Sequence, residues 1–190
     1  LYGRTMGQYP ADPTMVFTLA PGSERPTGAA TLVDSVTSRM RTLVKTGPNG
    51  HRWRFAFENP GDRWMARELD DSEWKEAKSG FGTEGTPGAR LGTRWDTADI
   101  WLRTVIDVPK DFGKNGVWLD LHHDESVEVF VNGLPLLERK GHATDYERIH
   151  LSPGQISLFE PGKKNLIAVH CHQTAGGQYV DLGLMDLSLA

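Results

Sequence analysis

The stretch Val127-Glu128-Val129-Phe130-Val131-Asn132-Gly133 decides the fold class of this chain. Valines at every second position alternate with a charged and an aromatic residue, which is the pattern of a β-strand with one buried face. Asn-Gly directly after such a run favours the tight turn of a β-hairpin, because both residues readily adopt a positive φ. The stretch therefore predicts an antiparallel strand that turns back at Asn132-Gly133.

The same alternation recurs on both sides of this hairpin. Further strand-like runs cover residues 52–57, 100–106, 117–122, 147–151, 166–173 and 179–189. The single cysteine, Cys171, lies on the predicted buried face of its run. At least seven strands at short spacing, with little helix, predict an all-β chain folded as an antiparallel β-sandwich. The acidic stretch Asp70–Trp74 predicts one capped helical turn.

Length and composition set the limits of the function. The 190 residues are 38% hydrophobic and carry a net charge of -4, which is typical of one globular domain with or without an arm. Residues 1–50 are rich in proline and predict an N-terminal arm or edge strands, and residues 51–190 predict the sandwich domain. The mild acidity gives no basic surface for nucleic acid, and no apolar run is long enough for a membrane span.

A set of motifs between Trp64 and Leu184 resembles a known family. In chain order they are Asp70-Asp71-Ser72-Glu73-Trp74, Gly80-Phe81-Gly82, Asp99-Ile100-Trp101-Leu102-Arg103, the Val127–Gly133 stretch, Asn165-Leu166-Ile167-Ala168-Val169 and Gly177-Gln178-Tyr179-Val180-Asp181. This order resembles the galactose-binding-like jelly roll. It is similar to the sugar-binding domain of β-galactosidase and β-glucuronidase type glycoside hydrolases and to related accessory carbohydrate-binding modules. The resemblance implies a jelly-roll sandwich, a carbohydrate ligand, a neighbouring catalytic domain in the same polypeptide, and an extracellular or periplasmic location.

The first candidate binding group is Trp95-Asp96, which follows a glycine-rich loop at residues 79–93. A sugar site pairs a flat aromatic face with a few placed polar groups, and an exposed Trp95 ring beside the Asp96 carboxylate would supply both. The alternative is that Trp95 fills the core beneath the loop.

The second candidate is His123-Asp124-Glu125, at the end of the predicted strand 117–122. Polar residues between two apolar strands predict a loop at the end of the sandwich. The two carboxylates of Asp124 and Glu125 could accept sugar hydroxyls or hold a structural calcium ion through oxygen ligands. The alternative is a solvated turn.

The third candidate is the segment from Gln173 to Asp181, in which two glycines allow a close approach of the backbone to a ligand. We expect Gln173, Gln178, Tyr179 and Asp181 to contact the ligand. By the resemblance, the last part of this segment matches a stretch that runs close to the active site in β-galactosidase, so it could lend a residue to a neighbouring catalytic pocket. The alternative is a hairpin in which Tyr179 covers the edge of the core.

The fourth candidate is a histidine cluster. His170 and His172 lie on the same face of one strand, and with His122 on a neighbouring strand they would form a three-histidine metal site. The alternative is an outer face of polar rings packed on another domain or on the arm.

Taken together, these patterns predict a non-catalytic carbohydrate-binding or accessory module of a larger carbohydrate-active protein, without a cofactor. Neither a Gly-x-Ser-x-Gly elbow nor a phosphate-binding loop occurs in the sequence. Two other functions stay open. One is a structural or assembly domain that docks through residues 1–50, and the other is a small metalloenzyme built on His122, His170 and His172.

Overall fold

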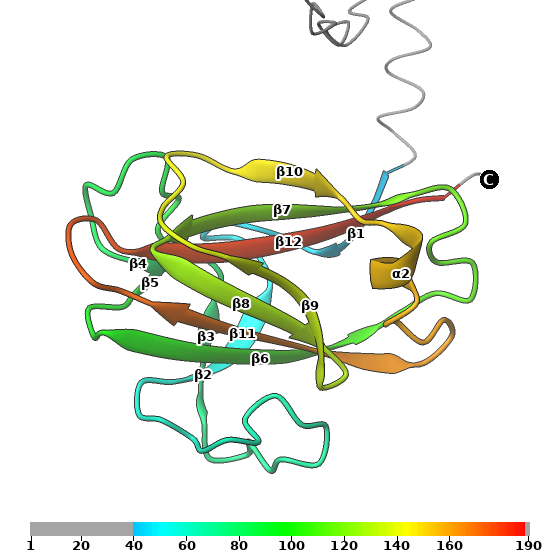
Figure 1. Cartoon of the computed structure of the whole chain (residues 1–190), viewed down its shortest axis with the longest axis horizontal. Helices are drawn as coiled ribbons and strands as arrows, with labels where there is room; N and C mark the ends of the chain where they lie inside the picture. Colours follow the sequence, from blue (N-terminus) through cyan, green and yellow to red (C-terminus); the bar gives the residue numbers. More distant parts are fainter. Residues whose placement is uncertain (1–39, 189–190) are drawn as a thin grey trace, which may run out of the picture.

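The computed structural model describes residues 40–188, which form two β-sheets packed face to face (Figure 1). Sheet A contains, in spatial order, β10 (Glu147–His150), β7 (Val117–Asp124), β12 (Tyr179–Leu187), β4 (Phe81–Gly82) and β5 (Thr93–Arg94), and β1 (Met40–Val44) also pairs with β12. Sheet B contains β3 (Lys75–Lys78), β2 (Arg52–Ala56), β6 (Asp99–Asp107), β11 (Lys164–His172), β8 (Ser126–Val131) and β9 (Leu134–Arg139). The predicted all-β sandwich is therefore confirmed.

The core lies between the two sheets and follows the alternation of the sequence. Leu119 and Leu121 of β7 face Val169 and Cys171 of β11, and all four side chains are at most 1% exposed. Burial at this depth excludes water from apolar surface, which is the main favourable term in folding. The predicted burial of Cys171 is confirmed, and burial raises the pKa of its thiol because the thiolate would be poorly solvated.

The hairpin predicted from the Asn-Gly pair connects β8 to β9. Asn132 and Gly133 have φ values of 56° and 84°, as a tight turn between antiparallel strands requires. The Asn132 side chain also accepts from the backbone N–H of Leu166 at 3.0 Å and donates to the carbonyl of Leu158 at 2.9 Å. The turn is thereby tied to two other parts of the chain.

One predicted feature differs in the structure. Asp70–Trp74 forms a turn and no helix: the backbone N–H of Ser72 donates to the Asp70 carboxylate at 3.0 Å, which competes with helical hydrogen bonding. The helix found within residues 40–188 is the short α2 (Pro153–Ile156). In addition, β1 pairs with β12 from Met40 to Val44, so the sandwich includes the end of the 1–50 segment, whereas residues 1–39 lie outside the described part.

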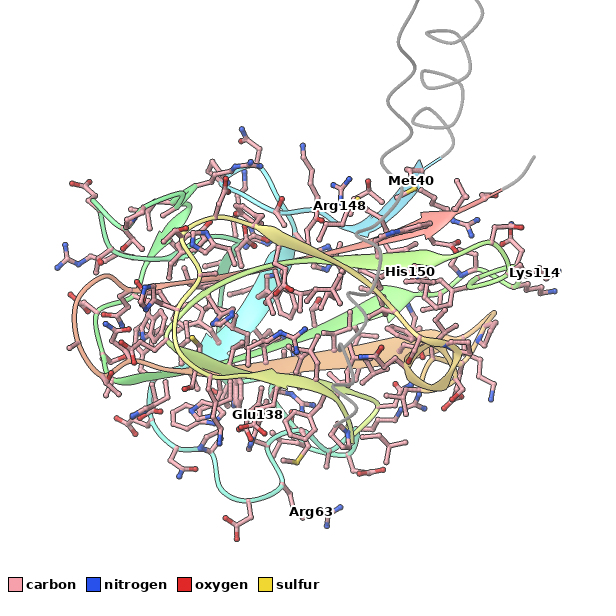
Figure 2. All side chains as sticks on the ribbon, turned by 45° about the horizontal axis from the view of Figure 1, so that its top comes forward. Met40, Arg63, Lys114, Glu138, Arg148 and His150 are labelled. Carbon is pink, nitrogen blue, oxygen red and sulfur yellow. The ribbon has the colours of Figure 1, made fainter. Side chains whose placement is uncertain are left out.

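Long connections cover the outer faces of both sheets. The segment 57–74 folds back under sheet B, and Figure 2 shows Arg63 at its tip, away from the two sheets. Arg103 of β6, which is 2% exposed, holds this segment through Asp71 and through the backbone carbonyls of Trp64 and Ala66. The segments 79–93 and 140–146 lie over one part of sheet A, as described below. Outward-facing side chains of both sheets are therefore buried where these segments cross them.

Candidate functional site

Three segments meet at the end of the sandwich where β7 ends and β12 begins. Backbone pairing places Tyr179 opposite Asp124, and the Gln178 side chain donates to the carbonyl of Thr97 at 2.6 Å. The hydroxyl of Thr174 donates to the Glu125 carboxylate. The structure thus brings most of the predicted binding segments together. We call Asp124, Glu125, Gln173, Gly177 and Gln178 the sandwich-end site.

Gly177 opens space at the centre of the sandwich-end site. A Cβ atom at this position would lie 2.6 Å from Oδ2 of Asp124, closer than real contacts allow. The absence of a side chain therefore lets the Asp124 carboxylate approach the backbone of the loop. The Gln173 side-chain amide donates to the carbonyl of Gly177, which places a second polar group against the same glycine.

Two acceptors in the sandwich-end site have no donor within residues 40–188. The carboxylate of Asp124 is on a residue only 7% exposed and accepts no hydrogen bond from the described residues, and Oε1 of Gln173 is buried without a partner. Burial raises the pKa of Asp124, and the nearby negative charge of Glu125 adds to the shift, while His142 and His123 oppose it. Of the two acceptors, Oε1 of Gln173 is the buried one without a partner, and buried acceptors are normally satisfied. A carboxylate and an amide oxygen that both lack a donor suit a ligand that brings donors.

Trp95 does not offer a face to a ligand. Its side chain is fully buried, and the indole N–H donates to the hydroxyl of Thr97 at 3.0 Å and the carbonyl of Asp99 at 3.2 Å. The prediction of an exposed aromatic platform at Trp95 is therefore wrong, because the ring fills the core below the loop. Asp96 is exposed but pairs with Arg94, with 2.8 Å between Nη2 and Oδ2.

His123 lies in the wall of the sandwich-end site and not on its surface. It is 4% exposed, and its Nδ1 contacts the carbonyl oxygen of Glu125. This contact fixes the turn that carries the Glu125 side chain. His123 therefore shapes the site, whereas its ring has little surface left for a ligand.

Tyr179 and Asp181 belong to a separate cluster on the outer face of sheet A. Oδ2 of Asp181 accepts from the Tyr146 hydroxyl at 2.6 Å and from the backbone N–H of Gly47 at 2.7 Å. The hydroxyls of Tyr146 and Tyr179 lie 2.8 Å apart, and Tyr179 also accepts from the backbone N–H of Arg90 at 3.1 Å. These contacts tie three separate loops to β12.

The electrostatics of this tyrosine–aspartate cluster follow from burial. Asp181 is 2% exposed, and desolvation raises the pKa of its carboxyl to about 6 although every hydrogen bond to it acts in the opposite direction. Burial likewise lowers the pKa of His122, whose ring packs on Tyr179 and whose Nδ1 has no partner among the described residues. The Arg90 guanidinium lies 4.6 Å from the centre of the Tyr146 ring. Sequence reasoning missed Tyr146 and Arg90, since both lie in loops without a recognisable pattern.

The predicted three-histidine site is not formed. His122 belongs to β7 in sheet A, whereas His170 and His172 belong to β11 in sheet B, so the three rings lie on different sheets. Both histidines of β11 instead contact Oδ1 of Asp99 at 2.8 Å. The His170 ring stacks on Trp101 with centroids 4.7 Å apart. Within the described part of the chain, no group of three or more His, Cys, Asp and Glu side chains is placed to hold a metal ion.

Solved structures show where this architecture occurs elsewhere. A family 2 glycosyl hydrolase from Bacteroides cellulosilyticus matches with a TM-score of 0.53 and 15% identity, over 77% of this chain and 20% of that one. A β-glycosidase from Bacteroides vulgatus matches with a TM-score of 0.52 and 22% identity, over 76% and 20% of the two chains. A β-glucuronidase from Ruminococcus gnavus matches with a TM-score of 0.51 and 13% identity, over 78% and 29%.

The chain has the fold of one domain of these glycosidases. The resemblance stated from the sequence is confirmed at the level of the fold, and the chain spans only about a fifth of the length of the first two structures. The sequence matches no protein-family model and no curated protein. Among residues 40–188, no helix has the length and apolar character needed to cross a membrane.

Proposed function

We propose that this chain is a non-catalytic accessory domain of a larger carbohydrate-active protein, and that its sandwich-end site binds sugar hydroxyls next to a catalytic domain of the same polypeptide. The observation that carries the proposal is a pair of acceptors next to Gly177, the Asp124 carboxylate and Oε1 of Gln173, which accept no hydrogen bond from residues 40–188. Hydroxyl groups are donors, so one that reaches Oε1 of Gln173 satisfies a buried acceptor, and one that reaches the Asp124 carboxylate forms a charge-assisted hydrogen bond.

The likeness to glycosidase domains supports the same function, because the matched region is a small part of each of those chains. A domain of this size beside a catalytic domain can support substrate binding without performing the reaction. We accordingly propose a protein that acts on or binds carbohydrate outside the cytoplasm. The acceptor oxygens of Asp124 and Gln173 would then set the orientation of a sugar at the end of the sandwich.

The test is a titration of the 190-residue chain with galactose, glucuronic acid and their methyl glycosides. Nuclear magnetic resonance spectra recorded at each sugar concentration report the binding. We expect backbone signals of Gly177 and Glu125 to shift with added sugar. Asp124→Asn replaces one acceptor by a donor, and Gly177→Ala fills the space beside Oδ2 without requiring a positive φ at that residue. Each substitution should weaken binding by about tenfold, which corresponds to the loss of one hydrogen bond to a charged group.

Asp62→Asn is the matched control, because Asp62 is exposed and lies in the segment that folds under sheet B. It should leave the titration unchanged. If none of the sugars shifts the signals of the sandwich-end site, or if Asp124→Asn and Gly177→Ala bind as well as the unmodified chain, the site does not bind sugar. The domain would then have only a structural or assembly role.

A further inference from the structure

A cavity of about 310 Å³ lies at one edge of sheet B and shares no residue with the sandwich-end site. It is formed where β2 ends and β3 begins. Its lining residues are Phe55, Ala56, Phe57, Glu58, Glu73, Trp74 and Lys75. The volume is at the lower end of the range found for small-molecule sites in proteins.

Two aromatic side chains reach this cavity without being fully buried. Phe57 packs against Phe55 with ring centroids 5.1 Å apart, and Trp74 packs against the aromatic cluster on the outer face of sheet B. Both Phe57 and Trp74 keep part of their surface open to solvent. Partly exposed rings held by a packed core provide rigid, flat apolar walls. The fully buried Trp95 provides no such wall at the sandwich-end site.

The charged residues of the cavity are unpaired, in contrast to those of the neighbouring surface. The side chains of Glu58, Glu73 and Lys75 form no ion pair and no hydrogen bond with the described residues, whereas Arg52 and Glu76 on the same two strands pair at 3.0 Å. Three free charged groups around one cavity leave several strong hydrogen-bonding positions open.

The arrangement of charge selects the class of ligand. The carboxylates of Glu58 and Glu73 repel an anion, and the Lys75 ammonium weakens the attraction that they exert on a cation. A neutral ligand that carries many hydroxyls donates to carboxylates and accepts from an ammonium. Such a ligand also has apolar C–H faces that pack against aromatic rings.

We propose that this cavity binds one neutral sugar ring of an oligosaccharide, with a C–H face on Phe57 or Trp74 and hydroxyls on Glu58 and Glu73. The proposal concerns a second site and goes beyond the function proposed for the sandwich-end site. The cavity holds a single ring rather than a long chain, so further sugar units would extend into solvent. An accessory domain with such a site could hold a polysaccharide near the end of the sandwich where β2 ends and β6 begins.

The experiment is a calorimetric titration of the whole chain with three neutral oligosaccharides, cellohexaose, xylohexaose and mannohexaose. We expect at least one of them to bind with a millimolar or lower Kd. Glu73→Gln and Glu58→Gln should each weaken that binding by about tenfold, since both residues are exposed and lose only charge-assisted hydrogen bonds. Trp74→Ala should weaken it by a similar factor, and thermal unfolding reports whether this variant remains folded.

Two matched controls separate the possible outcomes. Asp62→Asn removes a negative charge outside the cavity and should leave oligosaccharide binding unchanged. Asp124→Asn alters only the sandwich-end site, so Glu73→Gln should weaken oligosaccharide binding by the same factor with and without it. Loss of binding in Asp124→Asn but not in Glu73→Gln would place the ligand at the sandwich-end site and overturn this proposal alone. Absence of binding by all three oligosaccharides up to about 10 mM would also overturn it.

Discussion

The hydroxyl of Tyr146 donates to the carboxylate of Asp181 at 2.6 Å, and this contact joins the loop before β10 to the central strand of sheet A. Tyr146→Phe removes the donor but keeps the ring. We expect the free energy of unfolding to fall by about 1–3 kcal/mol, because a nearly buried carboxylate loses a hydrogen bond. Urea unfolding of the two proteins at pH 7 measures the difference. An unchanged midpoint would mean that solvent replaces the Tyr146 hydroxyl.

Asp181 makes the free energy of unfolding fall as the pH rises, whereas an ordinary ion-paired carboxylate makes it rise. Its pKa is about 6 in the folded chain and lower in the unfolded chain, so between these values the folded state holds the extra proton. The free energy of unfolding contributed by this group is greatest below about pH 4 and falls as the pH rises to about 6, by up to about 3 kcal/mol. Asp181→Asn should remove this slope.

The measurement is the difference in unfolding free energy between the unmodified chain and Asp181→Asn at several pH values. Carboxylates whose pKa is lowered in the folded state, such as Asp71, contribute equally to both proteins and cancel. A difference that stays constant from pH 4 to pH 7 would show that Asp181 keeps an ordinary pKa in the folded chain.

Arg103→Lys tests what holds the 57–74 segment on sheet B. The Arg103 guanidinium bonds to the Asp71 carboxylate at 2.7 Å and to backbone carbonyls of the segment, and a lysine cannot place donors in all these directions. We expect a loss of about 1–3 kcal/mol, because buried backbone carbonyls lose a charged donor while the positive charge beside Asp71 is kept. Amide hydrogen exchange should become faster in residues 62–71, whereas exchange in β7 and β12 should change only with global stability.

Trp95→Phe tests whether the Trp95 side chain contributes to core packing or to sugar binding. Since the Trp95 ring is fully buried, its replacement leaves a cavity and removes the indole donor to Thr97 and Asp99, and we expect a loss of about 2–4 kcal/mol in the free energy of unfolding. Sugar titration of the folded variant should match the unmodified chain. Weaker binding without a change in stability would return Trp95 to the list of ligand-contacting residues.

The sequence predicted the strands whose side chains alternate strictly between core and outer face. Val127–Val131 and the run that contains Cys171 form β8 and most of β11, and the core residues of β7 were assigned to the correct face. Strands without that pattern were missed, as Lys75–Lys78 was, or were implied only by a predicted turn, as Leu134–Arg139 was. Lys75–Lys78 has no β-branched residue, and Leu134–Arg139 includes Pro135, yet both pair at the edges of sheet B. Edge strands need only backbone pairing on one side, so their sequences carry a weaker signal.

The candidate site was harder to predict than the fold because loops cover the outer faces of both sheets. Alternation places His122 and Asp181 away from the core, and a residue on such a face is normally exposed. Segments 79–93 and 140–146 bury both of them, at 0% and 2% exposure. Which loop folds over which strand depends on contacts such as Arg90 with Tyr146, and these contacts join residues far apart in the sequence.

The pairing of β1 with β12 has a mechanical consequence. Met40 lies opposite Leu187 and Val44 lies opposite Leu184, so the chain enters and leaves the described domain at the same end of one antiparallel ladder (Figure 1). A pulling force applied between Met40 and Leu187 would break the backbone hydrogen bonds between β1 and β12 one pair at a time. Strand β1 would separate from β12 at low force, and the ion pair between Arg41 and Asp186 would break with it. The sandwich-end site, at the opposite end of the sandwich, would stay in place.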